Sequence, residues 1–139
     1  MYLCAAAQAL GLKVAVITDS TEDGALQCAD WSLVDALDST AAIDRFLGVC
    51  DVVTFDKEAI TERTLLHMIK TQSQGRVAIN PGAEILLMLK DKALQKTWLQ
   101  QHGLPTLPFT IFSGRAGTVE FPIKKSGGAL VQKVRCGGY

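Results

Sequence analysis

Three short, mainly apolar runs, separated by helical patterns, constrain the fold of this chain more than any other feature. The runs are residues 13–18, 51–55 and 76–80, and a weaker strand pattern covers residues 31–34. Continuous apolar runs of this length are typical of strands that are covered on both faces, as in parallel sheets. The alternation therefore predicts an α/β fold, in which a doubly wound, mostly parallel sheet has helices on both faces.

Helix start and stop signals lie between the strands. The alanine-rich residues 2–10 end at Gly11, a residue type that commonly follows a helix. A second helix is predicted from Asp38-Ser-Thr to about Val49. A third begins at Thr61 or Glu62 and carries an apolar stripe of Leu65, Leu66, Met68 and Ile69. A fourth covers residues 81–89, and a fifth extends from a cap at Asp91 to about Gln101.

Composition excludes several classes of protein. The chain has 139 residues, 48% of them hydrophobic, which is enough for about one domain with its own core. Fourteen basic residues balance fourteen acidic ones, which argues against a general nucleic-acid or anionic-membrane binder. No apolar run is long enough to span a bilayer, so a cytoplasmic protein is expected. The four cysteines include no Cys-x-x-Cys pair, which argues against structural zinc.

The last nine residues look like a strand that enters a glycine-rich phosphate loop. Lys133 supplies a positive charge, and Gly137 and Gly138 would let backbone N–H groups approach phosphate oxygens. A Gly-Gly pair that stands alone more often marks a hairpin or a bulge. Support from the rest of the chain is therefore needed.

Four ordered segments, helped by Gln27-x-Ala29-Asp30, supply that support. They are residues 51–58, 90–96, 103–109 and 133–139. In order and spacing they resemble the carboxyaminoimidazole ribonucleotide synthetases of purine biosynthesis, a family of ATP-grasp ligases, over essentially the whole chain. The resemblance implies a Rossmann-like (pre-ATP-grasp) domain over 1–80, a helical connection over 81–106, and the first strands of an ATP-grasp α+β domain over 107–139, at 109–112 and 129–133.

The resemblance also implies a reaction. The family uses ATP and bicarbonate to carboxylate the amine of aminoimidazole ribonucleotide through a carboxyphosphate intermediate. The implied cofactors are ATP and Mg²⁺, with the metal ligands outside this chain, and the implied partners are these small molecules rather than nucleic acid or membrane. A homodimer is a family expectation.

Position by position, the resemblance assigns an ATP site. Lys133 matches the lysine that contacts nucleotide phosphate, and Gly137, Gly138 and Tyr139 match the start of the loop that covers the phosphates and closes over the substrate. Lys92 stands where the family usually has an arginine that contacts ATP. Lysine keeps the charge but lacks the planar fork, and a solvated helix charge explains Lys92 equally well.

Substrate binding is assigned to Asp56, Glu58 and Tyr139, and no catalytic residue is assigned. Asp56 and Glu58 match two family glutamates and follow a predicted strand, at the sheet edge where open α/β folds bind ligands. A capping or surface role explains both carboxylates equally well.

The chain departs from the family pattern at both ends. The first strand, with its Gly-Gly-x-Gln-Leu-Gly turn, and most of the phosphate loop are not in these residues, so we expect a fragment that is inactive alone. The strands beside the missing central strand should lack a partner on one edge. Two alternatives stay open: another ATP-grasp ligase, similar to glycinamide ribonucleotide transformylase or biotin carboxylase, or a non-catalytic binding or assembly module.

Overall fold

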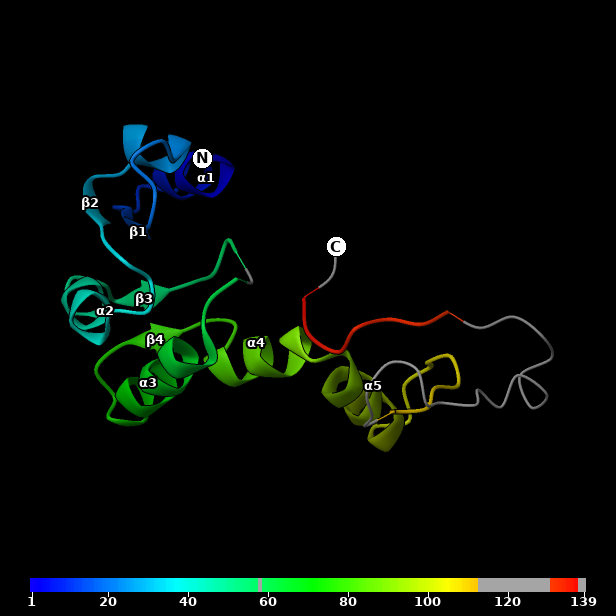
Figure 1. Ribbon diagram of the computed structural model, residues 1–139. Coiled ribbons are helices and arrows are strands. Elements are labelled where there is room, and N and C mark those ends of the chain that lie inside the picture. Colours follow the sequence, from blue (N-terminus) through cyan, green and yellow to red (C-terminus); the bar gives the residue numbers. More distant parts are fainter. Residues whose placement is uncertain (58, 113–130, 138–139) are drawn as a thin grey trace. The chain divides into compact units, whose positions relative to one another are not determined.

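The computed structural model describes residues 1–57, 59–112 and 131–137 (Figure 1). The chain divides into two compact units, Met1–Leu87 and Met88–Tyr139. Within the described residues, no helix combines the length and apolar character that crossing a membrane requires. In chain order the elements are α1 (Tyr2–Ala9), β1 (Ala15–Thr18), the 3₁₀ helix η1 (Gly24–Gln27), β2 (Trp31–Val34), α2 (Thr40–Leu47), β3 (Val52–Val53), α3 (Glu62–Ser73), β4 (Ala78–Ile79), α4 (Ala83–Lys90) and α5 (Lys92–Gln101).

The four strands of the first unit lie within the four runs that the sequence marks as strands. β1 pairs in parallel with β2, from Ala15 opposite Trp31 to Thr18 opposite Val34. β3 pairs in parallel with β4 through two residue pairs. Parallel strands that alternate with helices confirm the predicted α/β fold class.

The strands differ from the prediction in forming two separate pairs (Figure 1). Among the described residues, β1 pairs only with β2, and β3 pairs only with β4. In a parallel ladder, part of the backbone N–H and C=O groups of each strand faces away from its partner. Each of the four strands therefore has one edge that is unpaired within the described chain.

Local capping explains where α2 and α3 begin. The Ser39 hydroxyl accepts a hydrogen bond from the Ala42 amide at 3.3 Å, and the Thr61 hydroxyl accepts one from the Thr64 amide at 3.2 Å. Each side chain satisfies a backbone donor that has no partner inside its helix. Both caps lie where the sequence places the helix starts.

The core of the first unit lies around α2 and α3. Leu65 is completely buried and Met68 is 3% exposed, whereas Leu66 is 53% exposed, so the predicted apolar stripe of α3 was wrong at Leu66. Residue 66 follows Leu65 by one position, and adjacent helix positions face different directions. The buried core cluster comprises Ile43, Phe46, Leu47, Val53, Leu65, Met68, Val77, Ile79, Ala83 and Leu86.

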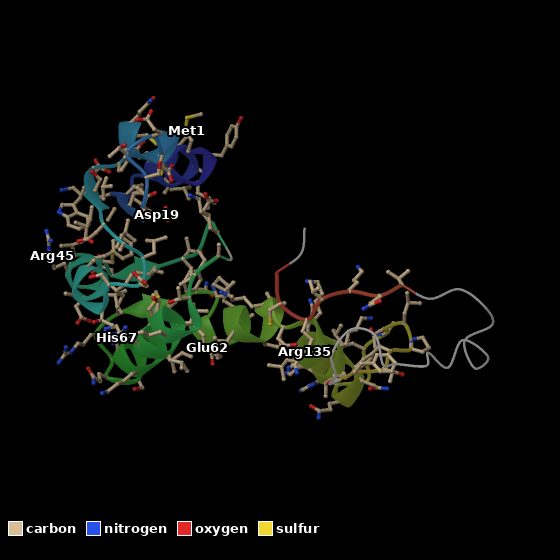
Figure 2. The ribbon with its side chains drawn as sticks, in the orientation of Figure 1. Met1, Asp19, Arg45, Glu62, His67 and Arg135 are labelled. Carbon is tan, nitrogen blue, oxygen red and sulfur yellow. The ribbon has the colours of Figure 1, made fainter. Side chains whose placement is uncertain are left out.

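A polar contact also joins α2 and α3. His67 Nε2 lies 2.7 Å from Asp44 Oδ1, and both side chains are partly open to solvent. Figure 2 labels His67 on α3. A partly exposed polar contact of this kind contributes little to stability, so the apolar cluster is the main link between the two helices.

The second unit contains α5 and irregular backbone. Phe109–Phe112 and residues 131–133 are not in strands, so the predicted strands are not formed there; residues 129 and 130 lie outside the described residues. A strand needs a neighbouring strand to bond its backbone. Phe109 instead lies beneath the ammonium of Lys96, 5.5 Å from the ring centroid, and Lys96 Nζ also donates to Thr106 Oγ1 at 3.3 Å.

Candidate functional site

The loops that follow β1 and β3 meet at Asp23. Thr18, the last residue of β1, donates its hydroxyl to Asp23 Oδ2 at 3.0 Å. Lys57, in the loop after β3, places Nζ 3.4 Å from the same oxygen. Open α/β sheets bind ligands at the carboxyl ends of their strands, so these side chains lie at the expected edge.

Asp23 is held ionised by its surroundings. Its Oδ1 accepts the Ala25 amide at 3.0 Å and thereby caps η1. This backbone hydrogen bond, followed by the Thr18 hydroxyl and more weakly by Lys57, lowers the pKa of Asp23 below its ordinary value. Hydrogen bonds donated to a carboxylate favour its charged form. A fixed negative charge therefore stands at this edge of the unit.

The residues predicted to bind substrate lie next to this contact in the chain. Asp56 is exposed and is followed by Lys57, the residue that reaches Asp23, while Glu58 lies outside the described residues. Thr18, Asp23 and Lys57 are not among the residues that the sequence predicts for the site. The signal that could have found them is the carboxyl-edge rule applied to the loop after β1 as well as to the loop after β3.

In the second unit, Lys92 and Gly137 of the predicted ATP site lie together. Lys92 Nζ donates to the Gly137 carbonyl oxygen at 2.6 Å. Gly137 has φ of 69°, in the left-handed region that favours glycine. Lys133 is exposed and has no hydrogen-bond partner within the described ranges. Gly138 and Tyr139 lie outside the described residues.

A charged pair that the sequence did not predict lies beside this contact. Arg135 (labelled in Figure 2) donates Nε to Asp91 Oδ1 at 3.1 Å and pairs its Nη2 with Asp91 Oδ2. Asp91 Oδ1 also accepts the amides of Ala93 and Leu94, at 2.8 and 3.2 Å, as the predicted cap of α5. The Arg135 guanidinium is the main cause that lowers the pKa of Asp91, and Asp91 in turn raises the pKa of Arg135.

No group of three or more His, Cys, Asp or Glu side chains in the described part of the chain is arranged to hold a metal ion. The groups that the structure does gather are single carboxylates, each beside one cation, as at Asp23 with Lys57 and at Asp91 with Arg135. We therefore assign no Mg²⁺ ligand to these residues.

Residues 1–90 match the family model of the ribonucleotide synthetase preATP-grasp domain, which covers both parallel strand pairs. The chain belongs to this family. The match confirms the family resemblance read from the sequence. The three predicted domain boundaries stay predictions, because a match to one domain does not test where the others begin.

Similar proteins extend the likeness beyond the preATP-grasp domain. The chain is 31% identical to the N5-carboxyaminoimidazole ribonucleotide synthase of Synechococcus elongatus, over 99% of this chain and 33% of the relative. It resembles the crystal structure of an ADP complex of N5-carboxyaminoimidazole ribonucleotide synthetase with a TM-score of 0.64 and 26% identity, over 74% of this chain and 26% of that one.

A third likeness concerns the fold alone. The ADP complex of N5-carboxyaminoimidazole synthetase from Staphylococcus aureus matches with a TM-score of 0.83 and 23% identity, over 99% of this chain and 36% of that one. The chain thus spans about a third of the length of the Synechococcus relative.

Proposed function

We propose that this chain is part of an ATP-grasp ligase that carboxylates 5-aminoimidazole ribonucleotide with bicarbonate in purine biosynthesis. The observation that carries the proposal is the preATP-grasp family match over residues 1–90, together with a relative of that name aligned over 99% of the chain. ATP with Mg²⁺, a cytoplasmic location and a homodimer belong to the same proposal.

The proposed reaction has two steps. The terminal phosphoryl group of ATP is transferred to bicarbonate, which gives ADP and carboxyphosphate. The amine of aminoimidazole ribonucleotide then attacks the carboxyl carbon, phosphate leaves, and the amine proton is released. Catalysis of phosphoryl transfer depends mainly on positioning and on neutralising charge, which are the tasks that lysine ammonium groups and backbone N–H groups perform.

Lys133, Gly137, Gly138 and Tyr139 are the proposed nucleotide residues. The ammonium of Lys133 is exposed and has no hydrogen-bond partner among the described residues, which supports this assignment because the ammonium is available to a phosphate oxygen. The left-handed backbone of Gly137 supports it as well, since a turn of this kind lets backbone N–H groups face an anion. Lys92 uses one of its three donors on Gly137, which leaves two for a phosphate.

Asp56 and Glu58, with Tyr139, are the proposed substrate residues. Asp56 is exposed, so its carboxylate can accept hydrogen bonds from ribose hydroxyls or from the substrate amine. The neighbouring contact between Asp23 and Lys57 supports this assignment, because it ties the loop that carries Asp56 to the loop after β1. A loop fixed in this way presents a carboxylate at lower entropic cost.

The test is ADP formation by the intact polypeptide that carries these residues. ADP release should require both aminoimidazole ribonucleotide and bicarbonate. Lys133→Ala should weaken ATP binding about tenfold or more, because it removes a charge-assisted contact. Lys70→Ala, which removes an exposed helix lysine of the first unit, is the matched control and should leave ATP binding unchanged. ADP release that is independent of aminoimidazole ribonucleotide would contradict the proposed function.

A further inference from the structure

Four hydrogen bonds join the start of α5 to a segment more than forty residues later in the chain; we call this set the clasp. Two connect Arg135 with Asp91 through side chains. A third runs from the Lys92 amide to the Arg135 carbonyl oxygen at 2.9 Å. The fourth runs from Lys92 Nζ to the Gly137 carbonyl oxygen at 2.6 Å. Two adjacent residues of the helix start thus hold both ends of the segment 135–137.

The clasp helps to supply hydrogen-bond acceptors for the first backbone amides of α5. The first N–H groups of a helix have no partner inside it. In α5, the Asp91 carboxylate accepts from Ala93 and Leu94, and the Arg135 carbonyl accepts from Lys92. The first three amides of α5 are therefore all used inside the chain. These three backbone N–H groups are accordingly not free to bind an anion.

The side chains of the clasp differ in exposure. Asp91 is 13% exposed at its side chain, whereas Arg135 is 55% exposed. The Asp91 carboxylate is thus largely buried, and both of its oxygens accept hydrogen bonds from the Arg135 guanidinium. A two-point arginine contact of this kind fixes direction as well as distance. Rotation of the segment about its own axis is restricted accordingly.

From this geometry we propose that Asp91 and Lys92 are positioning residues for the segment 135–137, and that the clasp sets Gly137 in place before a nucleotide binds. This inference rests on the proposed function for its ligand, ATP. Asp91 is not assigned to the nucleotide; it acts through Arg135. Lys92 positions residues 135–137 by donating one hydrogen bond to the Gly137 carbonyl, and this role is additional to the phosphate contact proposed above.

The expected consequence is an effect on ATP binding rather than on the chemical step. A segment that is ordered before binding loses less conformational freedom when the ligand arrives. Loss of the clasp should therefore raise the KM for ATP and leave kcat nearly unchanged, because a shared loss of ground-state and transition-state binding has that signature.

The first experiment tests the clasp without any nucleotide. The Lys92 amide is the first of α5, a position that usually exchanges quickly with solvent, so its protection reports the bond to Arg135. Asp91→Asn is the informative variant, because asparagine caps helices as well as aspartate does but cannot hold the guanidinium through a charge. We expect Lys92 amide exchange about tenfold faster in D91N, and easier tryptic cleavage after Arg135.

The matched control is Asp38→Asn, which removes the same charge from an exposed site that has no hydrogen bond within the described residues. It should leave both the exchange of the Lys92 amide and the cleavage after Arg135 unchanged. Unchanged Lys92 exchange in D91N would overturn the clasp, whatever the chain binds.

The second experiment uses the intact polypeptide and ATP. D91N should raise the KM for ATP about threefold to tenfold. Lys92→Met should do the same, and Lys92→Arg should restore most of the affinity because it keeps a donor for Gly137. A fall in kcat without a change in KM would overturn the positioning role. If the unaltered polypeptide binds no ATP while its Lys92 amide is protected, the proposed function fails and the clasp is purely structural.

Discussion

Different kinds of interaction stabilise the two units of this chain, each within itself. In the first, Met1–Leu87, apolar side chains from α2, α3, β3 and β4 share one buried cluster. In the second, the described apolar side chains are mostly open to solvent, and polar bonds at the start of α5 hold its segments. The exposed apolar residues there include Leu104, Leu107, Ile111, Phe112, Val131 and Val134.

The difference teaches which kind of change each unit tolerates. Burial of a large apolar side chain stabilises by about 1.5–3 kcal/mol, whereas an exposed ion pair contributes about 0–1 kcal/mol. Changes in the cluster should therefore affect the folding of the first unit, while changes in the second should affect local order.

The largest effect is expected at Leu65, which is completely buried. Leu65→Ala should lower the free energy of unfolding by about 2–5 kcal/mol, because it removes apolar contacts and leaves a cavity. Chemical denaturation followed by circular dichroism measures this. Leu66→Ala, one position later at 53% exposure, is the control and should cost far less. Equal losses in the two variants would contradict the placement of the core.

A smaller effect is expected at the cap of α3. Thr61→Ala should cost about 1 kcal/mol, because it leaves the Thr64 amide without its acceptor. Thr61→Ser keeps the oxygen and should recover most of this loss. The same denaturation experiment distinguishes the two, and a serine variant as unstable as the alanine variant would show that the methyl group matters instead.

The two units should also differ in their sensitivity to acid. The pKa of Asp91 is lowered in the folded chain, so its ionised form adds stability above its ordinary value of about 3.9, and this contribution is lost as the pH falls through the lowered pKa. NMR signals of the α5 start should change in that range before the methyl signals of Leu65 do. In D91N this acid step should be absent.

The smallest effect is expected at Leu107, which is 79% exposed. Leu107→Ser should change the free energy of unfolding by no more than about 0.5 kcal/mol, as surface substitutions usually do. Urea denaturation of the variant beside Leu65→Ala measures the contrast between the units. A loss comparable with that of Leu65→Ala would mean that the second unit also relies on apolar packing.

Local signals in the sequence predicted much of the fold. Ser39, Thr61 and Asp91 cap helices because a short polar side chain needs only the next three residues to do so. The run at 31–34 became β2, since four residues suffice for a strand with one neighbour. The expected strand at 109–112 did not form, because a strand also depends on a partner that a local pattern does not supply.

The candidate site was less predictable for the same reason. Lys92 and Gly137 were each assigned to one ATP site from the family resemblance, yet their direct contact spans 45 positions. The contact between Asp23 and Lys57 spans 34. Such pairs depend on how the chain folds back on itself, and no local periodicity encodes them.

The strand edges that are unpaired among the described residues have a consequence for the behaviour of these 139 residues in solution. A free strand edge is a template for any other extended chain, including an identical copy. The isolated polypeptide should therefore associate more as its concentration rises, and the monomer is best studied in dilute, cold and freshly prepared samples.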